Sequence, residues 1–322
     1  MNSSVCAVVV TYNRKNLLIE CLEALRKQTR PVQGIYLIDN ASTDETPELL
    51  LEKGYISELP PQNLREPWEK ESGISNFTDG NIINLHYVRM HENTGGAGGF
   101  YEGVKRGYEK GYDWLWLMDD DTVPEDNAVN SLLEKANELK DVSVGFLNSK
   151  VLWTDGTPHV MNIPTLKPLI NGTPFNLYED EEVLLVETAS FVSLLVNRDI
   201  VKKVGLPIKE FFIWADDVEY TLRISRSGLL GLYVKDSIVI HKTKNNYSAS
   251  NIYDWRFYYH VRNHLWISKL HYKRRYVLSL LKNILLTPTF PLRIGYLNIK
   301  ACIDSFIRSP KVEYCEEVRD SI

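Results

Sequence analysis

Cysteine is scarce in this chain, and its spacing argues against a cysteine-based metal site. Among 322 residues only four are cysteine, and no two of them form a C-x-x-C pair or a zinc-type spacing. They are Cys6, Cys21, Cys302 and Cys315. So few and so widely separated cysteines also argue against a disulfide framework, and we expect a protein of the reducing cytosol.

Long apolar runs are missing as well. No stretch approaches the roughly 18 uncharged apolar residues of a membrane-spanning helix. The nearest one, 278–294, is interrupted by two prolines and two cations: Lys282, Pro288, Pro291 and Arg293. The apolar run 4–10 is short and leads directly into polar residues, unlike a secretory signal. We therefore expect a cytoplasmic protein without a membrane span.

The chain also lacks the excess of positive charge that is typical of nucleic-acid-binding proteins. Its formal net charge is −5. Residues 251–322 contain 12 Lys and Arg against 6 Asp and Glu, a balance of +6, so the first 250 residues carry −11. This distribution argues against a general nucleic-acid binder. It leaves a basic C-terminal region that can meet an anionic membrane or pair with the acidic remainder.

Strand and helix patterns alternate along the first 120 residues. Short apolar runs at 5–10, 34–38, 82–88 and 114–118 predict strands. An apolar stripe from Leu18 to Leu25 predicts a helix. Thr43 or Asp44 is expected to cap the next helix, and residues 55–80 are expected to form an irregular insertion. These βαβ units predict an α/β fold with a mainly parallel sheet and a ligand site at the carboxyl ends of its strands.

The strongest local signal is the run Asp119-Asp120-Asp121 at the end of a predicted strand. In an extended chain Asp119 and Asp121 point to one side and Asp120 to the other. Three carboxylates this close repel one another unless a cation or hydrogen-bond donors neutralise them. Hard oxygen ligands suit Mg²⁺ or Mn²⁺, and such a metal would hold a diphosphate. A solvated acidic turn that caps a helix at Pro124 is the alternative.

A glycine-rich run, N-T-G-G-A-G-G, occupies residues 93–99. It lacks the Gly-Lys-Ser/Thr of a Walker loop and the glycine spacing of a Rossmann fingerprint. Bare N–H groups at the start of the following helix can still hold an anion or let a ligand approach closely. A flexible turn is the alternative.

A second acidic motif, Trp214-Ala-Asp216-Asp217, precedes a predicted helix, whose dipole favours charged carboxylates at its N-terminus. A tryptophan beside an acid pair is also typical of a sugar platform next to a general base. His241 follows the predicted strand 237–240 and can either complete a metal shell or be structural.

In this order the motifs resemble those of the family 2 glycosyltransferases with a GT-A fold. The resemblance starts with V-V-V-T-Y-N-R at 8–14 and covers about residues 4–245. Within that family, N-T-G-G-A-G-G-F at 93–100 and D-W with Y-Y-H-V-R-N in 254–263 are most similar to bacterial galactofuranosyltransferases and related rhamnosyltransferases. The resemblance implies a GT-A catalytic domain over 1–245, Rossmann-like with a mainly parallel mixed sheet flanked by helices. Residues 246–322 would form a C-terminal helical basic region.

The resemblance also implies roles for single residues. Thr11, Tyr12, Asn13, Arg14 and Asp39 would hold the nucleoside. Asn93, Thr94, Gly95 and Gly96 would lie along the sugar-diphosphate, with Asp119, Asp120 and Trp214 also contacting the donor. Asp119, Asp121 and His241 would bind Mn²⁺ or Mg²⁺. Asp217 would be the catalytic base and Asp216 an acceptor- or sugar-binding partner, although which of the two is the base remains open.

The implied reaction moves a sugar from a nucleotide-sugar to a hydroxyl of a growing polysaccharide or lipid-linked glycan. One base opposite the leaving group implies single displacement with inversion, because nothing identifies a carboxylate nucleophile. UDP-galactofuranose is the first choice of donor and dTDP-rhamnose the second. A nucleotidyltransferase remains an alternative, although Arg14 and Lys15 are a thin substitute for its basic phosphate loop. A non-catalytic carbohydrate-binding protein would explain the 11% aromatic residues but not the acid clusters.

Residues 255–310 are predicted to form a helical appendage. Basic residues cluster there with aromatic rings that favour a lipid headgroup region: Lys269, Lys273, Arg274 and Arg275 with Trp266, Tyr272 and Tyr276. Leu278, Leu281, Leu285 and Leu286 add an apolar stripe. We expect residues 266–286 to meet an anionic membrane, which would make the protein peripheral on the inner face of the cell membrane. Packing on the catalytic domain or on a second subunit of a homo-oligomer is the alternative.

Overall fold

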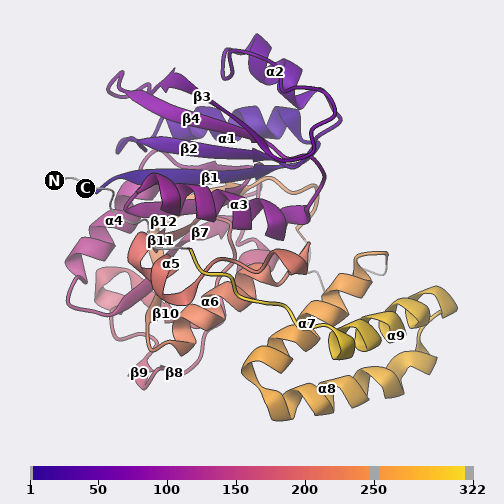
Figure 1. Ribbon diagram of the computed structural model, residues 1–322. Coiled ribbons are helices and arrows are strands. Elements are labelled where there is room, and N and C mark those ends of the chain that lie inside the picture. The colour runs from indigo at the N-terminus through magenta and orange to yellow at the C-terminus, as the bar shows by residue number, and fades with distance from the viewer. Residues whose placement is uncertain (1–2, 247–253, 316–322) are drawn as a thin grey trace, which may run out of the picture.

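Four parallel strands form the centre of a ten-stranded sheet in the computed structural model, which describes residues 3–246 and 254–315 (Figure 1). They are β1 (Val5–Thr11), β2 (Gly34–Asp39), β4 (Ile82–Arg89) and β5 (Trp114–Asp119). Every residue of β1 and β2 is buried, because helices cover both faces of the sheet. This burial explains why these strands read as unbroken apolar runs.

The remaining strands make the sheet mixed. Its order is β10-β12-β7-β11-β5-β1-β2-β4-β3, and β6 pairs with β12. These strands are β3 (Trp68–Ser75), β6 (Thr122–Pro124), β7 (Val144–Leu152), β10 (Val183–Val186), β11 (Leu194–Asn197) and β12 (Leu230–His241). β12 pairs with β7 in parallel and with β10 and β6 antiparallel. The last residue of β12, His241, thereby pairs with Thr122, directly after the aspartate run.

Two sets of helices pack on the two faces of the sheet. α1 (Lys15–Arg26), α2 (Thr46–Glu52) and α4 (Ala128–Glu138) contribute to the hydrophobic core on one face. α3 (Gly95–Lys110), α5 (Arg198–Val204) and α6 (Asp216–Arg226) contribute to the core on the other. Smaller elements lie in the connections: η1 (Val160–Asn162), β8 (Leu169–Ile170), β9 (Thr173–Pro174), η2 (Glu179–Glu181) and η3 (Lys209–Phe211). The expected α/β architecture, a mainly parallel mixed sheet flanked by helices, is confirmed.

Two expectations about the segment after β2 were wrong. Residues 55–80 are not irregular throughout, because β3 pairs antiparallel with β4 over eight residues at the sheet edge. Exposed and partly buried residues alternate along β3, so its sequence has no apolar run of the kind that predicts a strand. Neither Thr43 nor Asp44 caps α2, since Glu45 occupies the N-cap without a side-chain hydrogen bond. Asp44 instead accepts hydrogen bonds from Thr46 Oγ1 and from the backbone N–H of Lys15.

Three further helices extend from the sheet domain, as the C-terminal pattern predicts (Figure 1). They are α7 (Phe257–His271), α8 (Lys273–Leu286) and α9 (Leu292–Ile307), with η5 (Thr287–Thr289) between the last two. They share a small core of their own, and α7 also packs against α6 and the segment before it. None of the helices within 3–246 and 254–315 combines the length and apolar character that a membrane span requires. The expected boundary at 245/246 adjoins residues 247–253, which lie outside the described residues.

Candidate active site

The loops after β1 and β5 meet at one edge of the sheet, as the parallel pairing predicts. Thr11 donates a hydrogen bond from Oγ1 to Asp120 Oδ2 at 2.7 Å. The backbone N–H of Tyr12 donates to the same oxygen at 3.3 Å, and the Tyr12 side chain is 43% exposed. Asp120 is therefore turned towards the β1 loop, where hydrogen-bond donors hold it.

The loop after β2 joins the same edge. The backbone N–H of Asn13 donates to Ser42 Oγ at 3.1 Å, and Asn13 Oδ1 accepts from the backbone N–H of Thr43 at 2.6 Å. Asp39 is buried and its carboxylate is occupied within the protein. It accepts hydrogen bonds from the backbone N–H of Ser42, from Tyr87 Oη and from the guanidinium of Arg89. The carboxylate of Asp39 thus orders the loop that surrounds the predicted nucleoside position.

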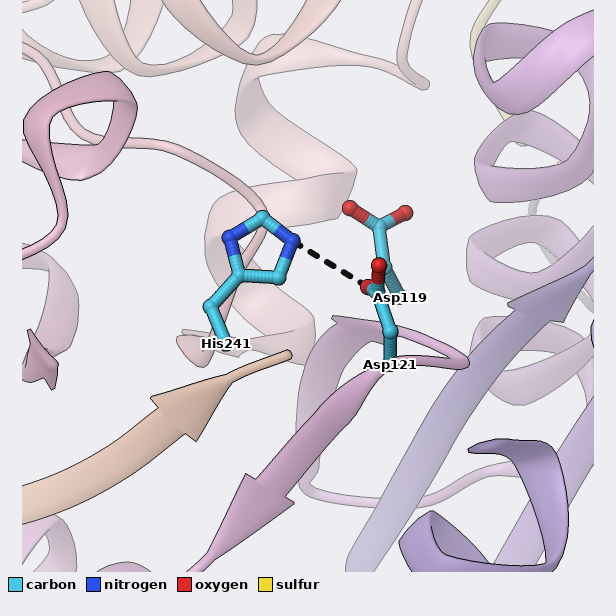
Figure 2. A group of neighbouring side chains, drawn as sticks. All are labelled: Asp119, Asp121 and His241. Atoms are coloured by element: carbon cyan, nitrogen blue, oxygen red, sulfur yellow. Dashed lines mark ion pairs between the residues drawn. The ribbon is translucent and has the colours of Figure 1, made fainter. Parts of the chain in front are cut away.

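Asp119 and Asp121 lie close together with His241 (Figure 2). One ligand atom from each of the three lies within 4.8 Å of the others, and His241 Nε2 is 3.1 Å from Asp121 Oδ1. The expected separation of Asp120 from Asp121 by an extended backbone is wrong, because residues 120–121 form a turn and the same guanidinium nitrogen of Arg14 contacts both carboxylates. The alternative of a solvated turn fails, because Asp121 is buried and Thr122–Pro124 continue as strand β6.

Asn162 determines which ring nitrogen of His241 faces the aspartates. Asn162 Oδ1 lies 2.8 Å from His241 Nδ1, while the amide nitrogen of Asn162 donates to Ser190 Oγ at 2.9 Å. The amide oxygen therefore accepts from Nδ1–H, and in the neutral ring Nε2 keeps its lone pair. Because Asp121 Oδ1 is also an acceptor, either a proton or a metal cation must lie between these two atoms. This is the arrangement of a metal-binding histidine with its supporting hydrogen bond.

Arg14 supplies positive charge to the aspartate run from the start of α1. Its guanidinium lies 3.3 Å from Asp120 Oδ1 and also forms an ion pair with Asp121, and about half of the Arg14 side chain is exposed. Burial raises the pKa of Asp121, but the hydrogen bond and charge of His241 and the charge of Arg14 outweigh it. The net pKa of Asp121 is therefore below its usual value. Burial and the charge of Asp121 raise the pKa of Asp119 to about 6. The cluster is thus short of positive charge.

The glycine run is part of helix α3 and not a turn before it, because α3 begins at Gly95. Gly95 has φ +72, and a side chain there would collide with the carbonyl oxygen of Phe212. Gly99 lets the helix approach Val10 of β1 closely, and Gly98 leaves room for the side chain of Thr94 in the same first turn, whereas the space beside Gly96 is open. The open position is the one at which a ligand can approach the backbone.

Asn40 ties the loop before α3 to the end of β2. The backbone N–H and the hydroxyl of Thr94 both donate to Asn40 Oδ1, at 3.0 and 2.9 Å, and Asn40 Nδ2 donates to the carbonyl oxygen of Gly95 at 2.6 Å. Asn93 Oδ1 accepts from the backbone N–H of Gly95 at 2.8 Å. These bonds hold the predicted diphosphate segment 93–96 next to the predicted nucleoside segment.

The second acid pair begins α6, as predicted, after a strained segment. Trp214 and Ala215 have positive φ angles of 64° and 67°, which non-glycine residues rarely adopt. Burial raises the pKa of Asp217 to about 6 and that of Asp216 well above its ordinary value, and the charge of Asp119 raises both. The fold therefore brings the acid pair into electrostatic range of the aspartate run, although the two are almost a hundred residues apart.

Sequence reasoning missed the residues that support this site. Those are Asn40, Tyr87, Arg89, His159 and Asn162, and each acts through a tertiary contact that no motif encodes. His159 lies against His241 with ring centroids 4.5 Å apart, and its pKa is lowered to about 4 by burial and the neighbouring ring. For Asn40 alone a signal was available, since it directly follows Asp39 at a strand end.

The pKa of Asp119 generates a prediction about stability. A carboxyl whose pKa is raised on folding stabilises the protein below its unfolded pKa, and this stabilisation is lost as pH rises through about 6. In EDTA at pH 7.5, Asp119→Asn should raise the free energy of unfolding by about 1–3 kcal/mol, with a smaller gain at acid pH. Urea denaturation measures this, with the exposed Asp126→Asn as the control that should show no gain. An equal or lower stability of Asp119→Asn at pH 7.5 would contradict it.

A search of curated proteins finds relatives among bacterial glycosyltransferases. Galactofuranosyltransferase GlfT1 of Mycolicibacterium smegmatis is 30% identical over 234 residues, which are 70% of this chain and 66% of that protein. The protein of the same name from Mycobacterium tuberculosis is 27% identical, over 71% of this chain and 67% of its own length. The match thus spans about two thirds of these relatives. The N-acetylglucosaminyl-diphospho-decaprenol L-rhamnosyltransferase of Mycobacterium tuberculosis is 24% identical, over 73% and 74% of the two chains.

Comparison with solved structures identifies the fold family. A crystal structure of GalNAc-T7 with UDP, GalNAc and Mn²⁺ superposes with a TM-score of 0.58 and 14% identity, over 93% of this chain and 54% of that one. This similarity identifies the GT-A fold. The family model described as "Glycosyl transferase family 2" matches residues 6–58 and 71–205, more than half of the chain, and includes the aspartate run. Fold, motifs and relatives agree, and the chain belongs to glycosyl transferase family 2.

Proposed function

We propose that this protein transfers galactofuranose from UDP-galactofuranose to a hydroxyl of a polysaccharide or lipid-linked glycan, with inversion and with a divalent metal. The observation that carries the proposal is the meeting of two acid clusters at one sheet edge, one with a histidine and one at a helix start. Support for the sugar comes from the relatives named galactofuranosyltransferase. dTDP-rhamnose is the second candidate donor, because a rhamnosyltransferase matches over a similar length at lower identity.

Asp119, Asp121 and His241 fit a divalent cation. Two hard carboxylates and an imidazole whose tautomer is set by Asn162 suit Mn²⁺ or Mg²⁺. Asp121 Oδ1 is buried, and among the described residues it faces only His241 Nε2, at 3.1 Å, so a cation between these two atoms would satisfy both. A bound metal would neutralise charge that develops on the leaving diphosphate. The related fold of GalNAc-T7 was crystallised with Mn²⁺ and UDP.

The nucleotide-sugar would lie across the loops that meet at this edge. Thr11 to Arg14 and Asp39 would surround the nucleoside, and the open face of Gly96 would let the diphosphate approach the start of α3. Because three protein donors already engage the carboxylate of Asp39, its part in holding the nucleoside is chiefly to order the loop. Arg14, half exposed and paired with the aspartates, can turn towards the phosphates when a metal takes its place.

Asp217 is our choice for the general base, with Asp216 as its partner on the acceptor or sugar. Burial and the charge of Asp217 keep the pKa of Asp216 well above its usual value, which favours the protonated carboxyl and suits it better to donating a hydrogen bond. The pKa of Asp217, about 6, suits a base that accepts a proton near pH 7. Trp214, two residues before Asp216, would provide a flat surface for a sugar ring.

The C-terminal helices carry an apolar face that the sheet domain does not cover. Leu278, Leu281 and Leu285 are 68%, 52% and 77% exposed, and within the described structure α8 has no buried residue. Residues 255–303 hold nine Lys and Arg and no Asp or Glu. We propose that the exposed residues of 266–286 bind an anionic membrane at the inner face of the cell membrane. Trp266 is not among them, because it is buried, and Lys269 is engaged by carbonyl oxygens at the end of α9. Two copies meeting through this face would bring like charges together, which disfavours a homo-oligomer there.

This assignment also supports two functional parts: a catalytic domain over 1–245 and a membrane-docking region over 246–322. Packing of the stripe on the catalytic domain, the alternative from the sequence, is at odds with its exposure. The apolar stripe would insert into the headgroup boundary, and each basic residue near the surface would add about 1 kcal/mol of attraction.

Donor binding tests the proposed reaction. UDP-galactofuranose with Mn²⁺ should raise the melting temperature more than dTDP-rhamnose or GDP-sugars, because a ligand that binds the folded state stabilises it by mass action. Asp121→Ala should abolish the metal-dependent part of this binding in calorimetry and leave the fold intact. The absence of nucleoside diphosphate release with every donor and acceptor would favour a carbohydrate-binding module instead.

Substitution of Asp217 tests the choice of base. Asp217→Asn should leave donor affinity nearly unchanged and lower kcat by a factor of about 10²–10⁴, since it removes a proton acceptor and keeps the shape of the side chain. In the wild type, kcat should rise with pH through about 6, as Asp217 loses its proton. If Asp217→Asn stays active while Asp216→Asn is inactive, the base is Asp216.

Vesicle sedimentation tests the membrane surface. The protein should pellet with vesicles that contain anionic lipid, less so as salt rises, and remain in solution with neutral vesicles. Charge reversal of Lys273, Arg274 and Arg275 to Glu should release it. Reversal of the exposed Lys27, Lys53 and Lys140 on the sheet domain changes the net charge equally and should not. Equal recovery in the supernatant with and without anionic vesicles at low salt would identify the stripe as an oligomerisation or packing surface.

A further inference from the structure

The segment 210–215, which leads into the acid pair of α6, has a backbone that needs outside support. Phe212 has φ 66 and ψ −63, and Trp214 and Ala215 also have positive φ. Conformations of this kind are costly for residues with a side chain and persist only where the surroundings determine them. Ala215, the N-cap of α6, makes no side-chain cap hydrogen bond. The start of this helix is therefore not fixed by its own sequence.

Asn263 of α7 binds the carbonyl groups of this segment. Its Nδ2 lies 3.0, 2.9 and 2.8 Å from the carbonyl oxygens of Phe211, Ile213 and Trp214. Asn263 is completely buried. A buried carbonyl group without a donor is costly, and the two N–H groups of this one amide are shared among three carbonyl oxygens, of which that of Phe211 also accepts from the backbone N–H of Ile213.

Arg262 completes the contact and orients Asn263. Its guanidinium donates to the carbonyl oxygens of Glu210 and Phe211, at 2.8 and 3.0 Å. It also donates to Asn263 Oδ1, at 2.9 and 3.0 Å, which turns the amide nitrogen of Asn263 towards the segment. The guanidinium is buried against the ring of Trp266, 4.1 Å from its centroid. Because the guanidinium of Arg262 is fixed by Trp266 and donates to Asn263 Oδ1, the amide of Asn263 is held with its nitrogen towards the segment.

The segment is also held from its other side. The backbone N–H of Ala97, in the first turn of α3, donates to the carbonyl oxygen of Phe212 at 3.1 Å. Further along α6, Glu219 is buried and lies 3.0 Å from His271 Nε2 at the end of α7. The segment before Asp216 thus lies between α3 and α7, and α6 is bound to α7 along its length.

We infer that Arg262 and Asn263 are positioning residues for the proposed base: they hold the backbone of 210–215 so that the carboxylates of α6 face the aspartate run. This inference rests on the proposed function, in which Asp217 accepts the proton of the acceptor hydroxyl. It gives the R-N pair, conspicuous in the sequence, a function separate from the membrane surface of α8. Neither side chain touches the reacting atoms.

Kinetics of Asn263 variants test this positioning. Asn263→Asp keeps the shape and removes both N–H donors, so kcat should fall at least about tenfold, because small misplacements of a reacting group are costly. The KM for donor and the affinity for Mn²⁺ should change less than threefold. Asn263→Ser retains one donor, and should keep more of kcat and remain folded if the Asp variant does not. Leu265→Ala is the matched control, since it weakens the core of the C-terminal helices without touching the segment.

Hydrogen exchange supplies a readout that does not need turnover. Peptides from 210–218 should exchange faster in Asn263→Asp and Asn263→Ser than in wild type, and not in Leu265→Ala at a similar loss of melting temperature. Unchanged exchange in 210–218 in both Asn263 variants would overturn the inference, even if no donor is turned over by the wild type. Equal losses of kcat in Leu265→Ala and in the Asn263 variants would also overturn it, because the effect would then be one of general stability.

Discussion

Uncompensated negative charge at the carboxyl edge of the sheet is the constraint on which the rest of this structure depends. Asp119, Asp120 and Asp121 are adjacent in sequence and largely withdrawn from water, and Asp216 and Asp217 add to the same electrostatic field. Burying so many carboxylates is unfavourable unless cations or donors face them. Thr11 donates a hydrogen bond to Asp120, and Arg14 and His241 pair with Asp121, so the negative charge is partly compensated. A divalent cation at the Asp119–Asp121–His241 cluster would neutralise the remaining negative charge. Because the protein alone does not neutralise it, the site suits a metal-bound diphosphate.

The sheet supplies the geometry for this charge. Parallel pairing of β1, β2 and β5 brings three loops to one edge, and the pairing of β12 with β6 delivers His241 beside the aspartates. Buried amides then set the details. Asn40 joins the β2 loop to the start of α3, and Asn162 chooses the tautomer of His241. Side-chain amides suit this work because one group offers both a donor and an acceptor at fixed geometry.

The C-terminal helices connect two properties that the sheet domain alone would not have. Through α7 they support the strained segment before the acid pair, and through α8 they present an apolar and basic surface. The residues that contact the segment are on the buried side of α7, and the exposed leucines are on α8. In the proposed function, one small helical unit therefore both binds the membrane and holds the proposed base, and the two roles use different side chains.

Much of the fold and part of the site follow from the sequence by itself. Fully buried strands are recognisable as apolar runs, strand ends as polar loops, and the aspartate run as a candidate metal site at the end of a buried strand. Local physics suffices for these features because the interacting residues are neighbours in the chain. The edge strand β3 was not predicted, because one of its faces is exposed and its sequence therefore contains no apolar run. Only the tertiary structure decided which atoms meet: Asn162 with His241, Asn263 with the carbonyls of 211–214, and the acid pair with the aspartate run. These contacts join residues some 50 to 100 positions apart, and their energies depend on burial and orientation, which the packing of the whole chain creates.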